Sequence, residues 1–176
     1  DTITPMVGIT LPSASFYNSL NKIEGTCSDN DSVLSVDLKI IRESDKYYWG
    51  GSAWGSTSLW VNPTVYTSSW TYTSVPSWVN GSSYTVIAKA WDASLLYSPV
   101  FSTKTFTYDV SYPTSVITFP VAGDKYEDVD SITGTALDSL SGVNSVYVQI
   151  KRNSDGTFWT GSSWGGVIWL KASGTT

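Results

Sequence analysis

The sequence predicts an all-β fold that consists of two tandem β-sandwiches, the second one truncated. Three observations support this prediction. Ser, Thr and aromatic residues are abundant, with nine Trp and eleven Tyr among 176 residues, and such a composition favours strands and polar turns over helices. Apolar and polar residues alternate along several segments, as in strands with one buried face. The sequence also repeats itself at a spacing of about 109 residues, which decides where the domains begin.

The strands of the first copy follow from this alternation and from the turns between segments. Leu34, Val36, Leu38 and Ile40 alternate with other residues and should form the buried face of one strand. A tight turn precedes Tyr84, whose phenol should bond back to the chain as in a tyrosine corner. About seven to nine strands in about 105 residues is typical of an immunoglobulin-like sandwich. The expected strands span residues 4–11, 22–27, 34–42, 46–49, 59–61, 69–73, 84–92 and 100–108.

The second copy reproduces only the first half of the first. Residues 48–55 return as residues 158–165, and Trp60 returns as Trp169, whereas residues 70–109 have no counterpart. We therefore expect an immunoglobulin-like β-sandwich at residues 1–109 and the first half of a second one at residues 110–176. A cut in the chain, a loss of order, or completion by strands of another chain would each explain the missing half. A cut is favoured, because an uncovered half-sandwich has unpaired edges.

The composition excludes several classes of function. The net charge is −5 and the pI about 4.5, without a run of Lys or Arg, so nucleic acid is not expected as a partner. No stretch of about 20 apolar residues is present, so insertion into a membrane is not expected either. The sequence has no His, which removes the commonest general base and metal ligand. Because no other cluster of reactive groups replaces it, we expect no enzymatic activity.

The single cysteine has an ordinary structural interpretation. Cys27 corresponds to Ala136 in the second copy. A small buried residue on a strand is therefore expected at this position rather than a reactive thiol.

The motifs of both copies resemble the bacterial immunoglobulin-like repeats of large modular surface and secreted proteins. A strand that begins at Pro5 or Pro113 is followed by Ile-x-Gly-Thr, by Val-x-Ser-Val and by Trp-x-Gly-Ser-x-Trp, and Asn80–Val86 resembles the Gly-x-Tyr-x-Val strand. The cystine and the core Trp of antibody domains are missing. The resemblance implies an extracellular or cell-surface repeat that projects or connects another domain.

Tryptophans are the candidate ligand-binding residues. Their flat faces can stack on sugar rings, but their recurrence in both copies is equally expected if each set fills its own sandwich, and packing is the favoured interpretation. Among the remaining rings, Trp91 alternates outward from the buried face and is the one expected to be exposed. The candidate glycan-stacking residues are Trp49, Trp54, Trp60, Trp91, Trp159, Trp164 and Trp169.

Acidic loop residues raise calcium as an alternative. Asp29, Asp31 and Asp138 lie in equivalent loops, and Asp109 lies where the two copies meet. Calcium at such a junction needs about six to eight oxygen ligands from several segments. No EF-hand spacing is present, and solvated loops are the favoured interpretation. No cofactor is therefore expected, with calcium at the junction as the alternative.

The expected function is that of a non-catalytic structural or adhesive repeat, a stalk or spacer in a bacterial cell-surface or secreted protein. Its expected partners are neighbouring domains of the parent protein, together with glycans or other cell-surface ligands. Because this architecture carries many functions, two alternatives stay open. One is a carbohydrate-binding module that uses exposed Trp rings, and the other is a filament subunit that exchanges strands between chains.

Overall fold

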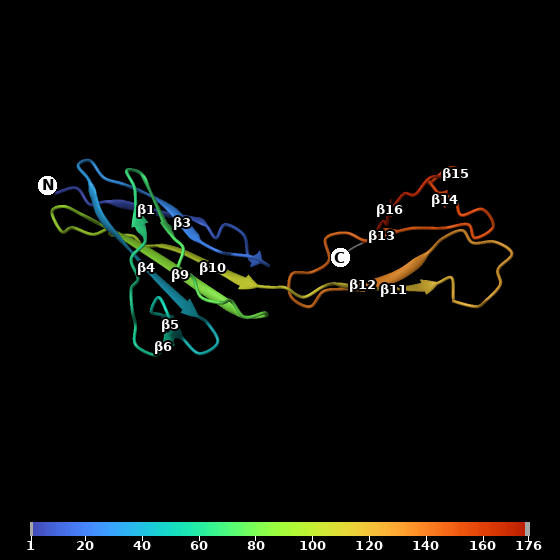
Figure 1. Ribbon diagram of the computed structural model, residues 1–176, viewed down its shortest axis with the longest axis horizontal. Helices are drawn as coiled ribbons and strands as arrows, with labels where there is room; N and C mark the ends of the chain where they lie inside the picture. Colours follow the sequence, from blue (N-terminus) through green and yellow to red (C-terminus); the bar gives the residue numbers. More distant parts are fainter. Residues whose placement is uncertain (1, 175–176) are drawn as a thin grey trace. The chain divides into compact units, whose positions relative to one another are not determined.

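The computed structural model describes residues 2–174, and this part of the chain contains strands but no helix. The predicted all-β class is therefore confirmed. The chain divides into two compact units, residues 1–110 and residues 111–176 (Figure 1). Among residues 2–174 there is no helix whose length and apolar character would let it cross a membrane.

The first unit contains two sheets. The four-stranded sheet has the order β1 (Met6–Leu11), β3 (Ile23–Ser28), β8 (Ser69–Tyr72) and β7 (Thr64–Val65). The six-stranded sheet has the order β2 (Phe16–Tyr17), β10 (Ser102–Tyr108), β9 (Ser83–Asp92), β4 (Val33–Arg42), β5 (Tyr47–Trp49) and β6 (Trp54–Gly55). The short β2 runs parallel to β10, and the other strand pairs of this unit are antiparallel.

The two sheets share one apolar core. Val36, Leu38 and Ile40 of β4 have no exposed surface, as the alternation predicts for a strand with one buried face. The strand β1 of the first sheet contacts β9 and β10 of the second, which is consistent with a β-sandwich. The core residues come from both sheets and include Ile9, Ile23, Cys27, Trp70, Tyr72, Tyr84, Val86, Ala88, Ala90 and Phe106.

The structure corrects the sequence-based strands at three places. Leu34 was expected on the buried face but is 57% exposed, because the register shifts between Val33 and Ser35. Residues 59–61 do not form a strand, and only Val61 pairs with Leu38 as an isolated bridge. The two-residue strands β2, β6 and β7 lie outside the expected ranges, since none of them shows alternation long enough to be recognised.

The described part of the second unit contains three two-stranded sheets. They pair β11 (Thr114–Phe119) with β12 (Thr133–Leu137), β13 (Tyr147–Val148) with β16 (Leu170–Lys171), and β14 (Phe158–Trp159) with β15 (Trp164–Gly165). No residue between 111 and 174 is buried. Ile117 is 59% exposed, whereas its counterpart Ile9 is 6% exposed. In the first unit β8, β9 and β10 cover the apolar residues of the core. The counterparts of these apolar residues in the second unit are therefore left uncovered.

The internal repeat extends to the register of the strands. Ile9 lies opposite Gly25 and Ile117 lies opposite Gly134, and in both pairs the register shifts directly afterwards. The Trp hairpins also match, because the first Trp of each motif pairs with the second. Both copies also require glycine at the same place, because a Cβ atom at Gly25 or at Gly134 would overlap the backbone of the opposite strand. The same sequence pattern thus produces the same local pairing twice.

Candidate functional site

The outer face of the six-stranded sheet carries a group of charged and aromatic side chains. Val36, Leu38 and Ile40 point into the core, so Asp37 and Lys39 between them point outward. Asp37 lies opposite Lys89 of β9. We call this group the outer-face cluster; it consists of Asp37, Lys39, Tyr48, Trp60, Asn62, Lys89, Trp91, Tyr97 and Phe101.

The loop before β7 places Trp60 and Asn62 in this cluster. The backbone N–H of Val61 donates to the carbonyl of Leu38 at 2.8 Å, and the N–H of Leu38 donates back to Val61 at 2.8 Å. Because Val61 lies beside Leu38, its two neighbours lie beside Lys39 and Asp37. Lys39 Nζ is 4.2 Å from the centre of the Trp60 ring, and Asn62 Nδ2 donates to Asp37 Oδ1 at 2.9 Å.

The Asp37 carboxylate is fully engaged within the cluster. Its Oδ1 accepts the hydrogen bond from Asn62, and its Oδ2 accepts the indole N–H of Trp91 at 2.9 Å. Lys89 Nζ lies 3.2 Å from the same Oδ2, in an ion pair whose side chains are largely covered. Trp91 therefore points outward as expected, but its side chain is half-buried rather than fully exposed.

The partners of the Lys39 ammonium are aromatic rings. Its ammonium lies over Trp60 and, at 5.6 Å, over Tyr48. Lys89 lies over the same Trp60 ring at 4.5 Å. Burial, together with the nearby positive charge of Lys89, lowers the pKa of Lys39 below its usual value. Among residues 2–174 no acidic side chain forms an ion pair with Lys39.

The connection between β9 and β10 adds two exposed rings to the cluster. Tyr97 is 51% exposed and Phe101 is 40% exposed. The Tyr97 ring lies 5.2 Å from Trp91, and the Phe101 ring lies 6.0 Å from Trp60. The exposed rings of Tyr97 and Phe101 thus pack against the half-buried indoles of Trp91 and Trp60.

Two of the candidate tryptophans have a structural position instead. Trp49 is part of the buried core, and its indole N–H donates to the carbonyl of Ser74 at 2.8 Å. Trp54 lies 5.5 Å from Trp49 and 5.7 Å from Tyr84, and the Arg42 guanidinium lies 4.8 Å from the Trp54 ring. Trp49 and Trp54 therefore pack in and against the core and are not part of the outer-face cluster.

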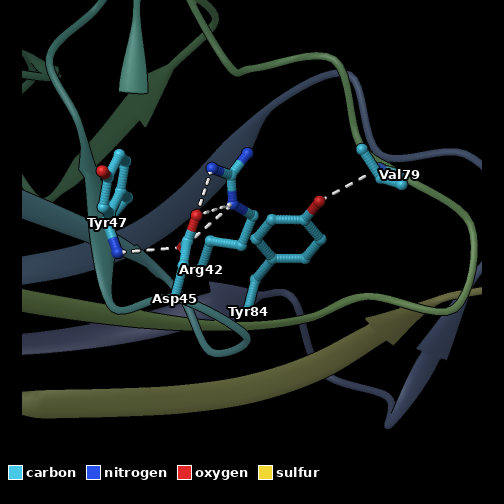
Figure 2. Close-up of polar contacts among 5 residues, drawn as sticks. All are labelled: Arg42, Asp45, Tyr47, Val79 and Tyr84. Carbon is cyan, nitrogen blue, oxygen red and sulfur yellow. Dashed lines mark hydrogen bonds and ion pairs between the residues drawn. The ribbon is translucent and has the colours of Figure 1, made fainter. Parts of the chain in front are cut away.

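The turn before this hairpin is held by an arginine. Arg42 donates to the Asp45 carboxylate, with Nε 3.1 Å from Oδ1, and the backbone N–H of Tyr47 donates to the same oxygen at 3.1 Å (Figure 2). The Arg42 hydrogen bonds lower the pKa of Asp45. Arg152 and Asp155 form the equivalent ion pair in the second unit. The recurrence of this pair indicates a structural role in the turn.

The candidate tryptophans of the second unit are more open. Trp164 lies 4.7 Å from the Arg152 guanidinium and contacts Trp159, whereas Trp169 is 61% exposed. The charged residues of the outer-face cluster are not repeated here, because Tyr147 and Gln149 occupy the positions of Asp37 and Lys39. The second unit therefore has exposed indoles without the cluster.

The acidic loops have local hydrogen-bonding roles. Asp29 Oδ2 accepts the backbone N–H of Asp31 at 3.2 Å. Asp138 Oδ1 accepts three successive backbone N–H groups, from Leu140, Ser141 and Gly142. Within the described part of the chain, no group of three or more Asp, Glu, Cys or His side chains is placed to hold a metal ion.

The composition of the cluster was only partly predicted from the sequence. Trp60 and Trp91 were candidates, but the two lysines, Asp37 and the exposed Tyr97 and Phe101 were not. Their alternation marks Asp37 and Lys39 as outward-facing, but only the pairing of β4 with β9 shows which residues they meet.

No protein-family model, no curated protein and no solved structure matches this chain.

Proposed function

We propose that this chain is a non-catalytic structural or adhesive repeat, a stalk or spacer segment of a bacterial cell-surface or secreted modular protein. In this proposal the first unit is an immunoglobulin-like sandwich and the second is the first half of another. The observation that carries the proposal is the duplication itself. Both copies share the same strand register, the same register shift and the same Trp hairpin. Repetition of one module is typical of proteins that extend by adding units.

The arrangement of the first unit suits serial connection. The strand β1 begins at one end of the unit and β10 ends at the opposite end (Figure 1). A module with this arrangement can pass a load from its first strand to its last. Its long central pairs, β4 with β9 and β9 with β10, are antiparallel and hydrogen-bonded along most of their length.

Stretching the full chain in a force spectrometer tests this proposal. A load-bearing first unit, residues 1–110, should unfold in one cooperative step with a length gain on the order of 35 nm, because an extended residue spans about 3.5 Å. Gradual extension of the first unit without a force peak would contradict a spacer role.

A second candidate function is carbohydrate binding at the outer-face cluster. The specific observation in its favour is that the two copies agree in their core positions but differ at this cluster. Lys39 and Asp37 are replaced by Gln149 and Tyr147, so the charges are not needed for the strand pairing that both copies share. Screening the full chain against a glycan array tests this candidate, with Trp60→Ala as the variant that should lose binding.

A further inference from the structure

We propose that the outer-face cluster selects acidic saccharides, with the ammonium of Lys39 as the partner of a sugar carboxylate and with Tyr97 and Phe101 as the rings against which the saccharide packs. This inference rests on the carbohydrate-binding candidate and adds the chemical class of its ligand.

The first step of the argument concerns charge. The cluster contains two lysines and one aspartate, and the aspartate already receives the Trp91 indole, the Asn62 amide and the Lys89 ammonium. Lys39 is left with aromatic faces as its partners. A partly covered ammonium next to a second lysine gains from an anionic partner, because charge-assisted hydrogen bonds are the stronger ones. The cluster is thus locally positive on a chain whose net charge is −5.

The second step concerns the fixed position of the ammonium. The Lys39 ammonium lies over both the Tyr48 and the Trp60 ring, and Trp60 is itself packed against Phe101. A lysine held by cation–π contacts loses less freedom on binding than a mobile surface lysine. Binding sites combine such a placed polar group with apolar surface.

The third step concerns the apolar surface. Tyr97 and Phe101 lie 6.3 Å apart and both are exposed. They stand at the edge of the cluster, next to Trp91 and Trp60 respectively. Phe101 packs against Trp60, the ring that the Lys39 ammonium covers, so the exposed rings offer packing surface in the same cluster as the ammonium. This suits a ligand that has both apolar ring faces and carboxylates. An oligosaccharide of uronic acids has this combination.

The fourth step uses the second copy as an internal comparison. Gln149 stands at the position of Lys39, and its amide donates to the carbonyl of Ile168. The pairing of Val148 with Leu170 corresponds to the bridge between Leu38 and Val61. The backbone pairing is therefore kept while the ammonium is absent, which shows that a glutamine is compatible with this strand.

Calorimetric titration of the full chain with oligogalacturonate, with neutral malto-oligosaccharide and with polyglutamate tests the inference. The wild-type chain should bind oligogalacturonate at least tenfold more tightly than either other ligand. Lys39→Gln should weaken this binding about tenfold, as expected for loss of one charge-assisted hydrogen bond, and Lys39→Arg should retain most of it. Lys104→Gln, an exposed lysine on β10, is the matched control and should change the affinity less than twofold.

Each result is decisive. Equal or tighter binding of the neutral saccharide would overturn the acidic selectivity and leave the carbohydrate-binding candidate in place. Binding of none of the saccharides would overturn both. Tighter binding of polyglutamate would identify an acidic peptide as the partner and overturn the inference, and so would unchanged oligogalacturonate binding by a correctly folded Lys39→Gln variant.

Discussion

The phenol oxygen of Tyr84 accepts a hydrogen bond from the backbone N–H of Val79 at 3.0 Å (Figure 2). This bond ties the start of β9 to the loop that precedes it, as the tight turn before Tyr84 predicts. The Tyr84 ring is fully buried and lies 4.7 Å from the Trp78 ring and 5.6 Å from the Phe106 ring. The corner therefore joins a hydrogen bond at the edge of the unit to the aromatic part of its core.

Removing only this hydroxyl should destabilise the first unit. Tyr84→Phe keeps the ring packing but leaves the partly buried N–H of Val79 without its acceptor, which we expect to cost about 1 to 2 kcal/mol. Urea unfolding followed by Trp fluorescence measures the change. Tyr66→Phe is the matched control, because the Tyr66 side chain is exposed. Equal stability of the two variants would show that the corner bond does not contribute.

Gly25 should tolerate no side chain. A Cβ atom at this position would overlap the carbonyl oxygen of Gly8 and the Trp70 ring. Because backbone and a buried ring must move, Gly25→Ala should lower the free energy of unfolding by about 3 kcal/mol, the upper part of the range for overpacking. Gly55→Ala is the control, since no atom lies within 4 Å of its Cβ position. A mild effect at Gly25 would mean that β1 and β3 can separate without loss of the core.

The parts of the fold that depend on local pattern could be predicted, and those that depend on contacts between distant segments could not. Val36, Leu38 and Ile40 alternate, and the period alone identifies their buried face. Leu34 continues the pattern in sequence but is exposed, because the pairing with β9 shifts before Ser35. Such a shift has no signal in a single strand.

The same limit applies to the candidate site. Trp60 could be recognised as a recurring aromatic residue, but its contact with Lys39 depends on the single bridge between Leu38 and Val61. Trp49 belongs to the same motif and lies in the core. The spacing of the motif is the same whether a ring is inside or outside, so only the strand pairing separates these positions.

Cys27 should be unreactive in the folded chain. It is buried, and burial raises the pKa of its thiol above the usual value. At pH 8 a thiol-specific reagent should therefore label the native chain slowly and the urea-unfolded chain rapidly; comparable rates would contradict the buried position. Between the pKa values of the unfolded and the folded thiol, the folded state holds more protons. The contribution of Cys27 to stability should thus fall as the pH rises through this window.

The uncovered second unit should respond differently from the first to the same substitution. Ile40 has no exposed surface, whereas its counterpart Ile150 is half-buried. Ile40→Ala should cost the first unit about 2 to 5 kcal/mol, as for deletion of a buried aliphatic side chain. Ile150→Ala should leave the unfolding transition of the first unit unchanged. Urea unfolding monitored by amide hydrogen exchange in each unit distinguishes the two, and equal losses would show that the units unfold together.

Lys39 should reduce the stability of the first unit near neutral pH. Burial and the neighbouring Lys89 lower its pKa, so its charged form is less favourable in the folded chain than in the unfolded one. Lys39→Gln should therefore be as stable as the wild type at pH 7 or more stable by about 0.5 kcal/mol, because the lost cation–π contacts offset part of the gain. In the alkaline window below the usual lysine pKa the unfolded chain holds more protons than the folded chain. The stability of the wild type should therefore rise with pH relative to this variant.

Urea unfolding of both chains from pH 7 to pH 10, with Lys104→Gln as control, measures the difference. A wild-type chain that is more stable at pH 7 and loses this advantage as the pH rises would mean that Lys39 is held by an attractive charge, which would remove the reason to expect an anionic ligand there.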